Sequence, residues 1–165
     1  MQRQPSAKPE VPQASDTKAS PQHTAMNLLA RREHSLAELR RKLIAREYDP
    51  DVVEDVIVDL AARNLVSDER FAEGYVNYRM RRGNGPVRIR QELAKRGVDD
   101  SIASIYLVNV ELSWNDCALD ARIKKFGSTL PEDFKAKAKQ MKFLEYRGFT
   151  TEQINSAFDK EATDD

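Results

Sequence analysis

The sequence predicts an all-α protein, an elongated tandem array of three three-helix repeats with about nine helices. Composition, an internal repeat and an alternation of charge predict this fold. The 165 residues are 40% hydrophobic and 33% charged but only 7% aromatic. Four of the seven prolines lie within the first 21 residues, so the rest is rich in helix formers and poor in turn residues. This composition argues against a β-sandwich or barrel.

The internal repeat has a period of about 50 residues. Leu39–Ile57, Ile89–Leu107 and Gln140–Phe158 resemble one another when Leu43, Leu93 and Leu144 are aligned. Three residues after each leucine stands an arginine, and five after it an apolar residue; these are Arg46, Arg96 and Arg147, then Tyr48, Val98 and Phe149. Apolar residues ten, thirteen and fourteen positions on share one helical face.

Charge alternates with the same period, although Lys+Arg and Asp+Glu both number 27. Residues 26–48, 76–98 and 121–147 carry +3, +6 and +5, whereas 49–75, 99–120 and 148–165 carry −6, −5 and −4. We therefore expect one basic face and one acidic face along the molecule.

The first repeat is expected at 24–66. A short helix should cover Met26–Glu33, and Ser35 with Glu38 forms a capping-box pattern before the next helix. Asp49 and Pro50 suit the start of a third helix. The expected inner faces comprise Leu36, Leu39, Leu43, Val53, Val56, Ile57 and Leu60.

The second repeat is expected at 67–112. Ser67 should start one helix that Gly83 stops, Gly85-Pro86 should open the next, and Asp99 or Asp100 should start the third. The expected inner faces comprise Phe71, Tyr75, Tyr78, Ile89, Leu93, Ile102, Ile105 and Tyr106.

The third repeat is expected at 113–160. Ser113 should precede a helix that ends at Gly127, a longer helix should follow Pro131, and Thr150 with Gln153 should cap the last. The expected inner faces comprise Trp114, Cys117, Ala118, Ala121, Phe134, Ala138, Met141, Leu144, Ile154, Ala157 and Phe158. Residues 1–23, rich in Pro, Gln and Ser, are expected to be a disordered tail, and 161–165 a flexible C-terminus.

Stacked helical repeats typically bind macromolecules along an extended face. The cations on and before the middle helix of each repeat would then form a basic ridge suited to a polyanion. The candidate contacts are Arg31, Arg32, Arg40, Arg41, Lys42, Arg79, Arg81, Arg82, Arg88, Arg90, Lys139 and Lys142. The alternative is that these cations only solubilise the helices and pair with nearby Glu.

Catalytic chemistry has little support. The chain has two histidines and one cysteine, no Walker lysine and no paired-carboxylate or His/Cys cluster. Cys117 lies on an apolar stripe, and Gly83-Asn84-Gly85 follows no strand, so neither indicates a nucleophile or a nucleotide site. We expect no catalytic residues, cofactor or metal. A single cysteine and the absence of a long apolar run favour a cytoplasmic protein without a membrane segment.

The residues also resemble a known family. Arg32-Glu33-His34-Ser35, followed by Glu38-Leu39 and Lys42-Leu43, resembles the opening signature of the RecX family. Further matching motifs follow in order: Asp68, Phe71-Ala72, Tyr75, Arg79, Gly85-Pro86, Arg88-Ile89 and Glu92-Leu93, then Trp114, Ala118, Lys139-Gln140-Met141 and Phe143–Phe149. The resemblance covers about Thr24 to Phe158.

This resemblance implies a regulator of the RecA recombinase in recombination, DNA repair and the SOS response. Family members lodge in the groove of the RecA–DNA filament, inhibit its ATPase, coprotease and strand-exchange activities, and bind DNA weakly. It implies no enzymatic activity, and we expect a monomer. The alternatives are an autonomous DNA-binding or architectural protein and a general helical-repeat adaptor for proteins. A nuclease or NTPase comes last.

Overall fold

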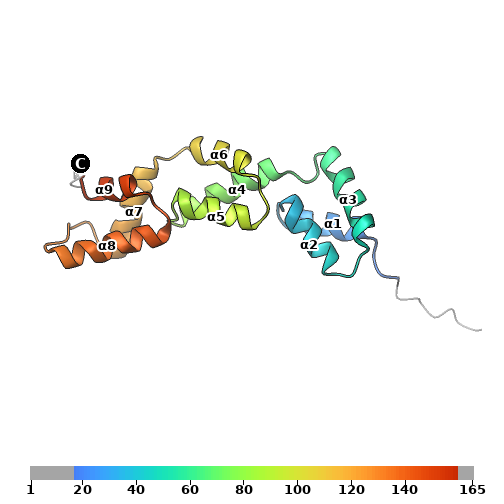
Figure 1. Cartoon of the computed structure of the whole chain (residues 1–165), viewed down its shortest axis with the longest axis horizontal. Coiled ribbons are helices and arrows are strands. Elements are labelled where there is room, and N and C mark those ends of the chain that lie inside the picture. Colours follow the sequence, from blue (N-terminus) through green and yellow to red (C-terminus); the bar gives the residue numbers. More distant parts are fainter. Residues whose placement is uncertain (1–16, 160–165) are drawn as a thin grey trace, which may run out of the picture.

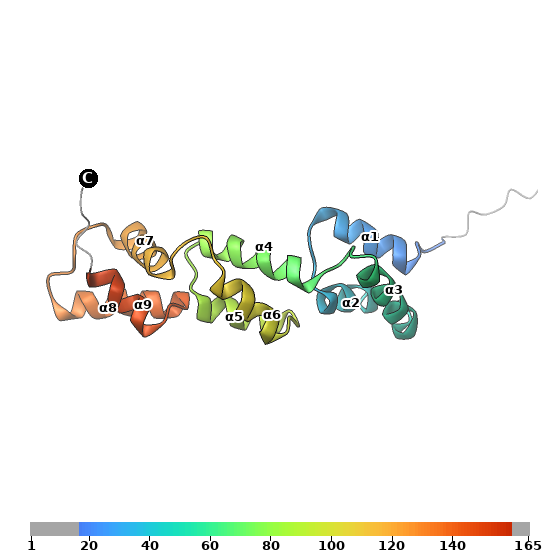
Figure 2. The ribbon, with the colours of Figure 1, turned by 90° about the horizontal axis from the view of Figure 1, so that it is seen from above.

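A computed structural model describes residues 17–159 and consists of nine α-helices in that range. They form three triplets that follow one another along an elongated molecule (Figures 1 and 2). The first contains α1 (Pro21–Arg31), α2 (Leu36–Ile44) and α3 (Pro50–Ala62). The second contains α4 (Asp68–Arg81), α5 (Pro86–Lys95) and α6 (Asp100–Val108). The third contains α7 (Trp114–Phe126), α8 (Phe134–Arg147) and α9 (Thr151–Asp159), which completes the expected all-α array of three-helix repeats.

Side-chain caps explain most of the helix starts. Ser35, Asp49, Ser67 and Ser113 accept hydrogen bonds from backbone N–H groups at the beginning of α2, α3, α4 and α7, as expected. Of the two candidates at α6, Asp99 is the cap. Thr150 and Gln153 bond reciprocally before α9, at 2.9 and 3.3 Å.

The start of the first helix was predicted too late. Helix α1 begins at Pro21 because Ser20 caps it and Pro suits the first helical position. Residues 21–23 are therefore helical and do not belong to the tail predicted for 1–23. The rest of that prediction for 1–16, and the one for 161–165, lie outside the described residues.

Each triplet has its own core. Leu39, Leu43, Val53, Ile57 and Leu60 are 0–1% exposed in the first, and Ile89 and Leu93 are fully buried in the second. The core of the third triplet contains Ala118, Leu144 and Ala157. It also contains Met80 of α4, which connects it to the second triplet. Four residues expected on inner faces are exposed instead: Tyr78, Ile105, Phe134 and Ala138.

Two glycines permit close contact between neighbouring repeats. A Cβ on Gly97 would lie 2.4 Å from the Cβ of Ala37, and one on Gly148 would lie 2.3 Å from the Cβ of Arg88. Both glycines have positive φ. Glu47 holds the equivalent position in the first repeat and also has a positive φ, of 62°.

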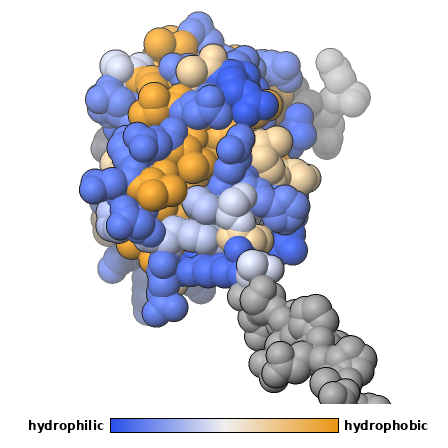
Figure 3. All heavy atoms as spheres, turned by 90° about the vertical axis from the view of Figure 1, so that its right-hand side faces the viewer, coloured by the Kyte–Doolittle hydropathy of each residue, from blue (hydrophilic) through white to orange (hydrophobic). Residues whose placement is uncertain are grey.

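The outer end of the first repeat leaves apolar surface open to solvent. Figure 3 shows this end, where apolar side chains lie exposed among polar ones. Val52, 47% exposed, occupies the repeat position of Ile102, which lines a small hollow where the second repeat meets the first. This end therefore exposes a position that is partly covered further along the array.

Candidate nucleic-acid interface

The middle and last helices of the repeats differ in charge and lie along opposite sides of the molecule. From their sequences, α2, α5 and α8 carry +2, +2 and +4, whereas α3, α6 and α9 carry −4, −1 and −2. In Figure 1 the first set follows the lower edge, and the second lies toward the upper edge. The helices of net positive charge thus lie on one side of the array and those of net negative charge on the other.

Five of the twelve candidate cations are held in ion pairs. Arg32 pairs with Glu38 at 3.1 Å, and Arg40 contacts both carboxylate oxygens of Glu54 on α3. Arg79, Arg88 and Arg90 also pair with carboxylates, namely Glu92 for the first two and Asp100 for the third. The Arg40 guanidinium is thus held toward Glu54 of α3. The pairs of Arg40, Arg79 and Arg90 join neighbouring helices, whereas Arg88 and Glu92 both lie on α5.

Glu92 is the centre of the most buried of these ion-pair clusters. Its oxygens accept hydrogen bonds from Arg79 at 2.8 Å, Tyr75 at 2.9 Å and Arg88 at 3.2 Å. Burial opposes ionisation of Glu92, but the bonds from Arg79 and Tyr75 outweigh it and hold its pKa below the ordinary value. Burial, with the bond to Glu92, raises the pKa of Tyr75 to about 12. This cluster fixes α4 against α5.

The remaining seven candidates differ in their surroundings. Lys42 is half-buried, and its ammonium donates to Nε2 of the buried His34 at 3.1 Å. Six are exposed and have no ion pair within residues 17–159: Arg31, Arg41, Arg81, Arg82, Lys139 and Lys142. Of these, Arg81 and Arg82 belong to a defined cleft.

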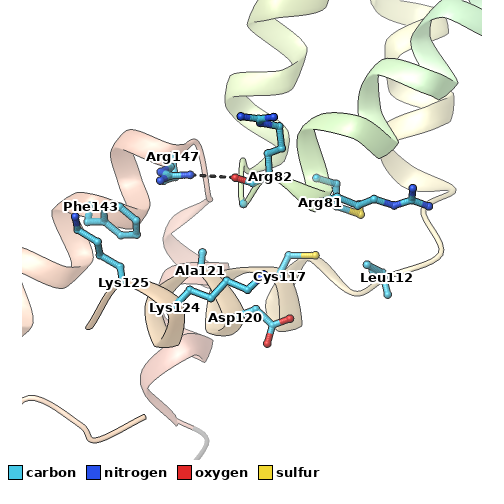
Figure 4. Close-up of a pocket in the computed structure, with 12 residues that line it drawn as sticks. Arg81, Arg82, Leu112, Cys117, Asp120, Ala121, Lys124, Lys125, Phe143 and Arg147 are labelled. Carbon is cyan, nitrogen blue, oxygen red and sulfur yellow. Dashed lines mark hydrogen bonds between the residues drawn. The ribbon is translucent and has the colours of Figure 1, made fainter. Parts of the chain in front are cut away.

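That cleft lies where the second repeat meets the third (Figure 4). It has a volume of about 590 Å³, and five cations surround it with Asp120 as the one carboxylate in its lining. The ends of α4, α7 and α8 supply these cations, which are Arg81, Arg82, Lys124, Lys125 and Arg147. Cations are favoured at helix C-termini, where the helix dipole is negative, so three converging helix ends concentrate positive charge.

Arg147 connects α8 to the second repeat through hydrogen bonds that involve backbone carbonyls. Its Nη1 donates to the Arg82 carbonyl at 3.1 Å, and its guanidinium lies 4.9 Å from the Phe143 ring centre. Its own carbonyl accepts from the N–H of Gly85 at 2.8 Å. Because the Arg82 carbonyl is neutral, the bond to it positions the Arg147 guanidinium without cancelling its charge.

A second basic hollow adjoins the cleft. It shares Arg82 and Arg147 with the cleft and adds Arg79 and Arg88 beside Tyr146. Tyr146 is 75% exposed, with the Arg88 guanidinium 5.3 Å from its ring centre. Cations bind phosphates, and an exposed aromatic ring can stack on a base. The two hollows together, which we call the basic seam, suit a nucleic-acid strand.

Three cations of the basic seam, Lys124, Lys125 and Arg147, are missing from the twelve candidates. A signal for Arg147 existed, because it occupies the repeat position of Arg46 and Arg96. Lys139 and Lys142, which were candidates, lie on α8 and do not line the cleft.

One thiol borders the basic seam. Cys117 borders the cleft but is only 8% exposed, and burial raises the pKa of its thiol. Among the described residues, no group of His, Cys, Asp and Glu could hold a metal ion. No helix between residues 17 and 159 is long and apolar enough to cross a bilayer.

Comparison with known proteins places the three repeats in order. Models of the first, second and third three-helix domains of RecX match residues 23–60, 67–107 and 115–158. Regulatory protein RecX of Pseudomonas fluorescens strain SBW25 is 41% identical over 150 residues, which cover 91% of this chain and 97% of the relative. Regulatory protein RecX of Halorhodospira halophila is 44% identical over 133 residues, covering 81% and 83%.

Solved structures share the fold. The crystal structure of RecX from Lactobacillus salivarius matches with a TM-score of 0.72 at 22% identity, over 86% of this chain and 94% of that one. A second crystal structure, of regulatory protein RecX, also gives 0.72 at 20% identity, over 85% and 74%. With three domain models in sequence and relatives of about 40% identity, the chain belongs to the RecX family.

Proposed function

We propose that this chain is a negative modulator of the RecA recombinase. It binds the RecA–DNA filament as a monomer in the cytoplasm and inhibits the filament's ATPase, coprotease and strand-exchange activities. Membership of a regulatory family supports the role, and the basic seam supports a partner that contains nucleic acid. Binding without catalysis accounts for the cleft, whose lining cations suit phosphates.

The separation of charge is the observation that carries the proposal. A filament presents phosphates and protein surface side by side, so its ligand benefits from two faces of opposite sign. The basic helices α2, α5 and α8 would approach DNA, and the acidic helices α3, α6 and α9 would meet basic protein surface. The basic seam supplies the strongest phosphate contacts, and exposed Arg31, Arg41, Lys139 and Lys142 supply weaker ones.

An autonomous DNA-binding protein is the main alternative, and the basic seam also favours it. The formal net charge of zero argues against it, because tight binding to bare DNA normally requires an excess of cations. We therefore expect weak affinity for bare DNA and higher affinity for the filament.

Purified protein added to preformed RecA filaments on single-stranded DNA tests the proposal. We expect a dose-dependent fall in ATP turnover, at substoichiometric doses if the protein caps filament ends and near one per RecA if it lines the groove. Arg81→Glu/Lys124→Glu should inhibit much less, at a matched midpoint of thermal unfolding. Unchanged ATP turnover at stoichiometric protein would reject the proposal.

A further inference from the structure

Helix α6 exposes a row of aliphatic side chains. Ile105 is 54% exposed and Val108 76%, and Leu112, in the loop between α6 and α7, is 53% exposed. A spacing of three residues places Ile105 and Val108 on the same side of the helix. The opposite side of α6 packs into the core through Ala103 and Leu107. The exposed row, which we call the α6 stripe, is therefore additional to the packing of its repeat.

The α6 stripe is confined to the second repeat. The positions equivalent to Ile105 and Val108 are occupied by Asp55 and Val58 in the first repeat and by Ser156 and Asp159 in the third. A repeat of this fold thus does not require two exposed aliphatic residues there. Adjacent exposed aliphatic side chains on one repeat indicate a contact surface.

The charge around the α6 stripe identifies the kind of partner. Residues 97–115, which include α6 and its flanking loops, contain three carboxylates, Asp99, Asp100 and Glu111, and no Lys, Arg or His. Asp100 pairs with Arg90 of α5, which leaves Asp99 and Glu111 as the uncompensated charges. Such a segment repels phosphates, which argues against nucleic acid and against an anionic membrane. It attracts a protein surface that presents Lys or Arg together with apolar side chains.

The α6 stripe can be occupied while the basic side of the molecule is engaged. In Figure 1, α6 forms the upper edge of the middle repeat and α5 the lower edge. At its end, Leu112 reaches the rim of the basic cleft (Figure 4). A ligand that combines nucleic acid with basic protein surface could therefore contact both features together.

We propose that the α6 stripe docks a basic protein surface that carries apolar side chains, on the protein component of the filament. This inference rests on the proposed function and assigns its protein contact to Ile105, Val108 and Leu112. Burial of aliphatic side chains against apolar groups of a partner is favourable roughly in proportion to the area removed from water. Loss of the stripe should weaken filament binding and leave contacts to bare DNA intact.

The variant Ile105→Glu/Val108→Glu tests this inference in the full-length chain. We expect its affinity for RecA filaments to fall by about 30-fold. Affinity for a bare single-stranded oligonucleotide should change by less than about threefold, because the substitutions lie away from the phosphate-binding side. Ile105→Ser/Val108→Ser, which adds no charge, should lose about 10-fold on filaments. Circular dichroism should show native helix content in both, because the two side chains are exposed.

Val58→Glu provides a matched control. It introduces the same side chain at the repeat position of Val108, on a residue that is 60% exposed. We expect filament affinity within about twofold of wild type. Equal filament affinity of the stripe variants and wild type would overturn the inference, as would an equal loss on bare DNA.

Two further results distinguish a failure of this inference from a failure of the proposed function. Self-association of the wild type in sedimentation, abolished by the stripe substitutions, would overturn the inference by assigning the surface to a second copy. If the wild type bound filaments no better than bare DNA, the proposed function itself would fail. Stripe variants that lose filament binding beside a wild type that binds filaments support both.

Discussion

The two junctions between repeats share one geometry but differ in charge. In each, the end of a middle helix packs against the start of the preceding middle helix: Arg96 and Gly97 meet Ser35, and Arg147 and Gly148 meet Gly85. The first junction is neutralised by ion pairs. Arg96 pairs with Glu38 at 3.4 Å, and Arg70 pairs with Glu33 at 2.9 Å.

At the second junction, arginine side chains donate hydrogen bonds to backbone carbonyls. Arg147 donates to the Arg82 carbonyl, and Arg88 approaches the Tyr146 carbonyl at 3.5 Å as well as pairing with Glu92. Five cations therefore surround the cleft with one carboxylate. The comparison shows that two repeats can stack without ion pairs that neutralise the cations at their junction. The uncompensated charge of the second junction is available for a polyanionic partner.

Loss of the close contact at the second junction should have the largest effect on stability. In Gly148→Ala the new Cβ would lie 2.3 Å from the Cβ and 2.6 Å from the backbone nitrogen of Arg88, at φ 94°. We expect a loss of about 3 kcal/mol in the free energy of unfolding, measured by urea denaturation. Gly97→Ala meets only the Ala37 side chain closely and should lose about 2 kcal/mol.

Two other glycines serve as controls. Gly127 has φ 91° but no atom near its Cβ position, so Gly127→Ala should cost about 1 kcal/mol from backbone strain alone. Gly74 lies within α4 with open space around it, so Gly74→Ala should stabilise the protein by about 0.5–1 kcal/mol. If Gly148→Ala cost no more than Gly127→Ala, the close approach would not hold in solution.

Ser35 has a double role that Gly85, its counterpart in the second junction, cannot have. Its hydroxyl caps α2 by accepting from the Glu38 N–H at 3.0 Å and donates to the Arg96 carbonyl at 2.6 Å. Ser35→Ala should therefore cost about 2 kcal/mol in chemical denaturation. Ser113→Ala removes only a cap and should cost about 1 kcal/mol. Equal costs would indicate that the bond to Arg96 contributes nothing.

The smallest effect concerns pH at the first junction. His34 is 1% exposed, and burial lowers its pKa below 6.5, with Arg32 and Lys42 adding to the shift while Glu38 and the Arg32 carbonyl oppose it. As pH falls below about 6.5, the unfolded chain binds a proton that the folded chain resists, so stability falls.

The variant His34→Asn tests this source of pH dependence. Its midpoint of thermal unfolding should fall less than that of wild type between pH 7.5 and 5.5. His23→Asn, at an exposed histidine on α1, should behave like wild type. Parallel pH profiles for His34→Asn and wild type would exclude His34 as the source.

Local rules predicted the architecture because each helix carries its own start signal and apolar stripe. The predictions of buried residues fail where the apolar spacing of a helix extends beyond the part that packs in the core. Tyr78 and Phe134 follow their stripes but lie at helix ends, where no neighbouring helix covers them. Ile105 is exposed on the outer side of α6, although its spacing resembles that of the core residues.

The candidate site was predictable as a face but not as a cleft. Block charge indicated a basic side, yet it could not distinguish cations held by carboxylates, such as Arg40, from those left uncompensated, such as Arg81. Arg122 shows the same limit: it is 1% exposed, donates to the Ala157 carbonyl at 2.9 Å, and lies near the Phe158 ring. Only tertiary neighbours decide which cation is structural.

The affinity of charge-reversed variants for a fluorescent single-stranded oligonucleotide, measured across salt concentrations, tests the difference between the junctions most directly. Arg81→Glu/Lys124→Glu alters the cleft, and Arg31→Glu/Arg46→Glu makes the same change in charge on the first repeat. We predict that the cleft variant binds about 30-fold more weakly and that its salt slope is smaller by about 2. The first-repeat variant should lose less than about threefold. Equal losses from the two variants would contradict the assignment of the phosphate-binding surface to the second junction.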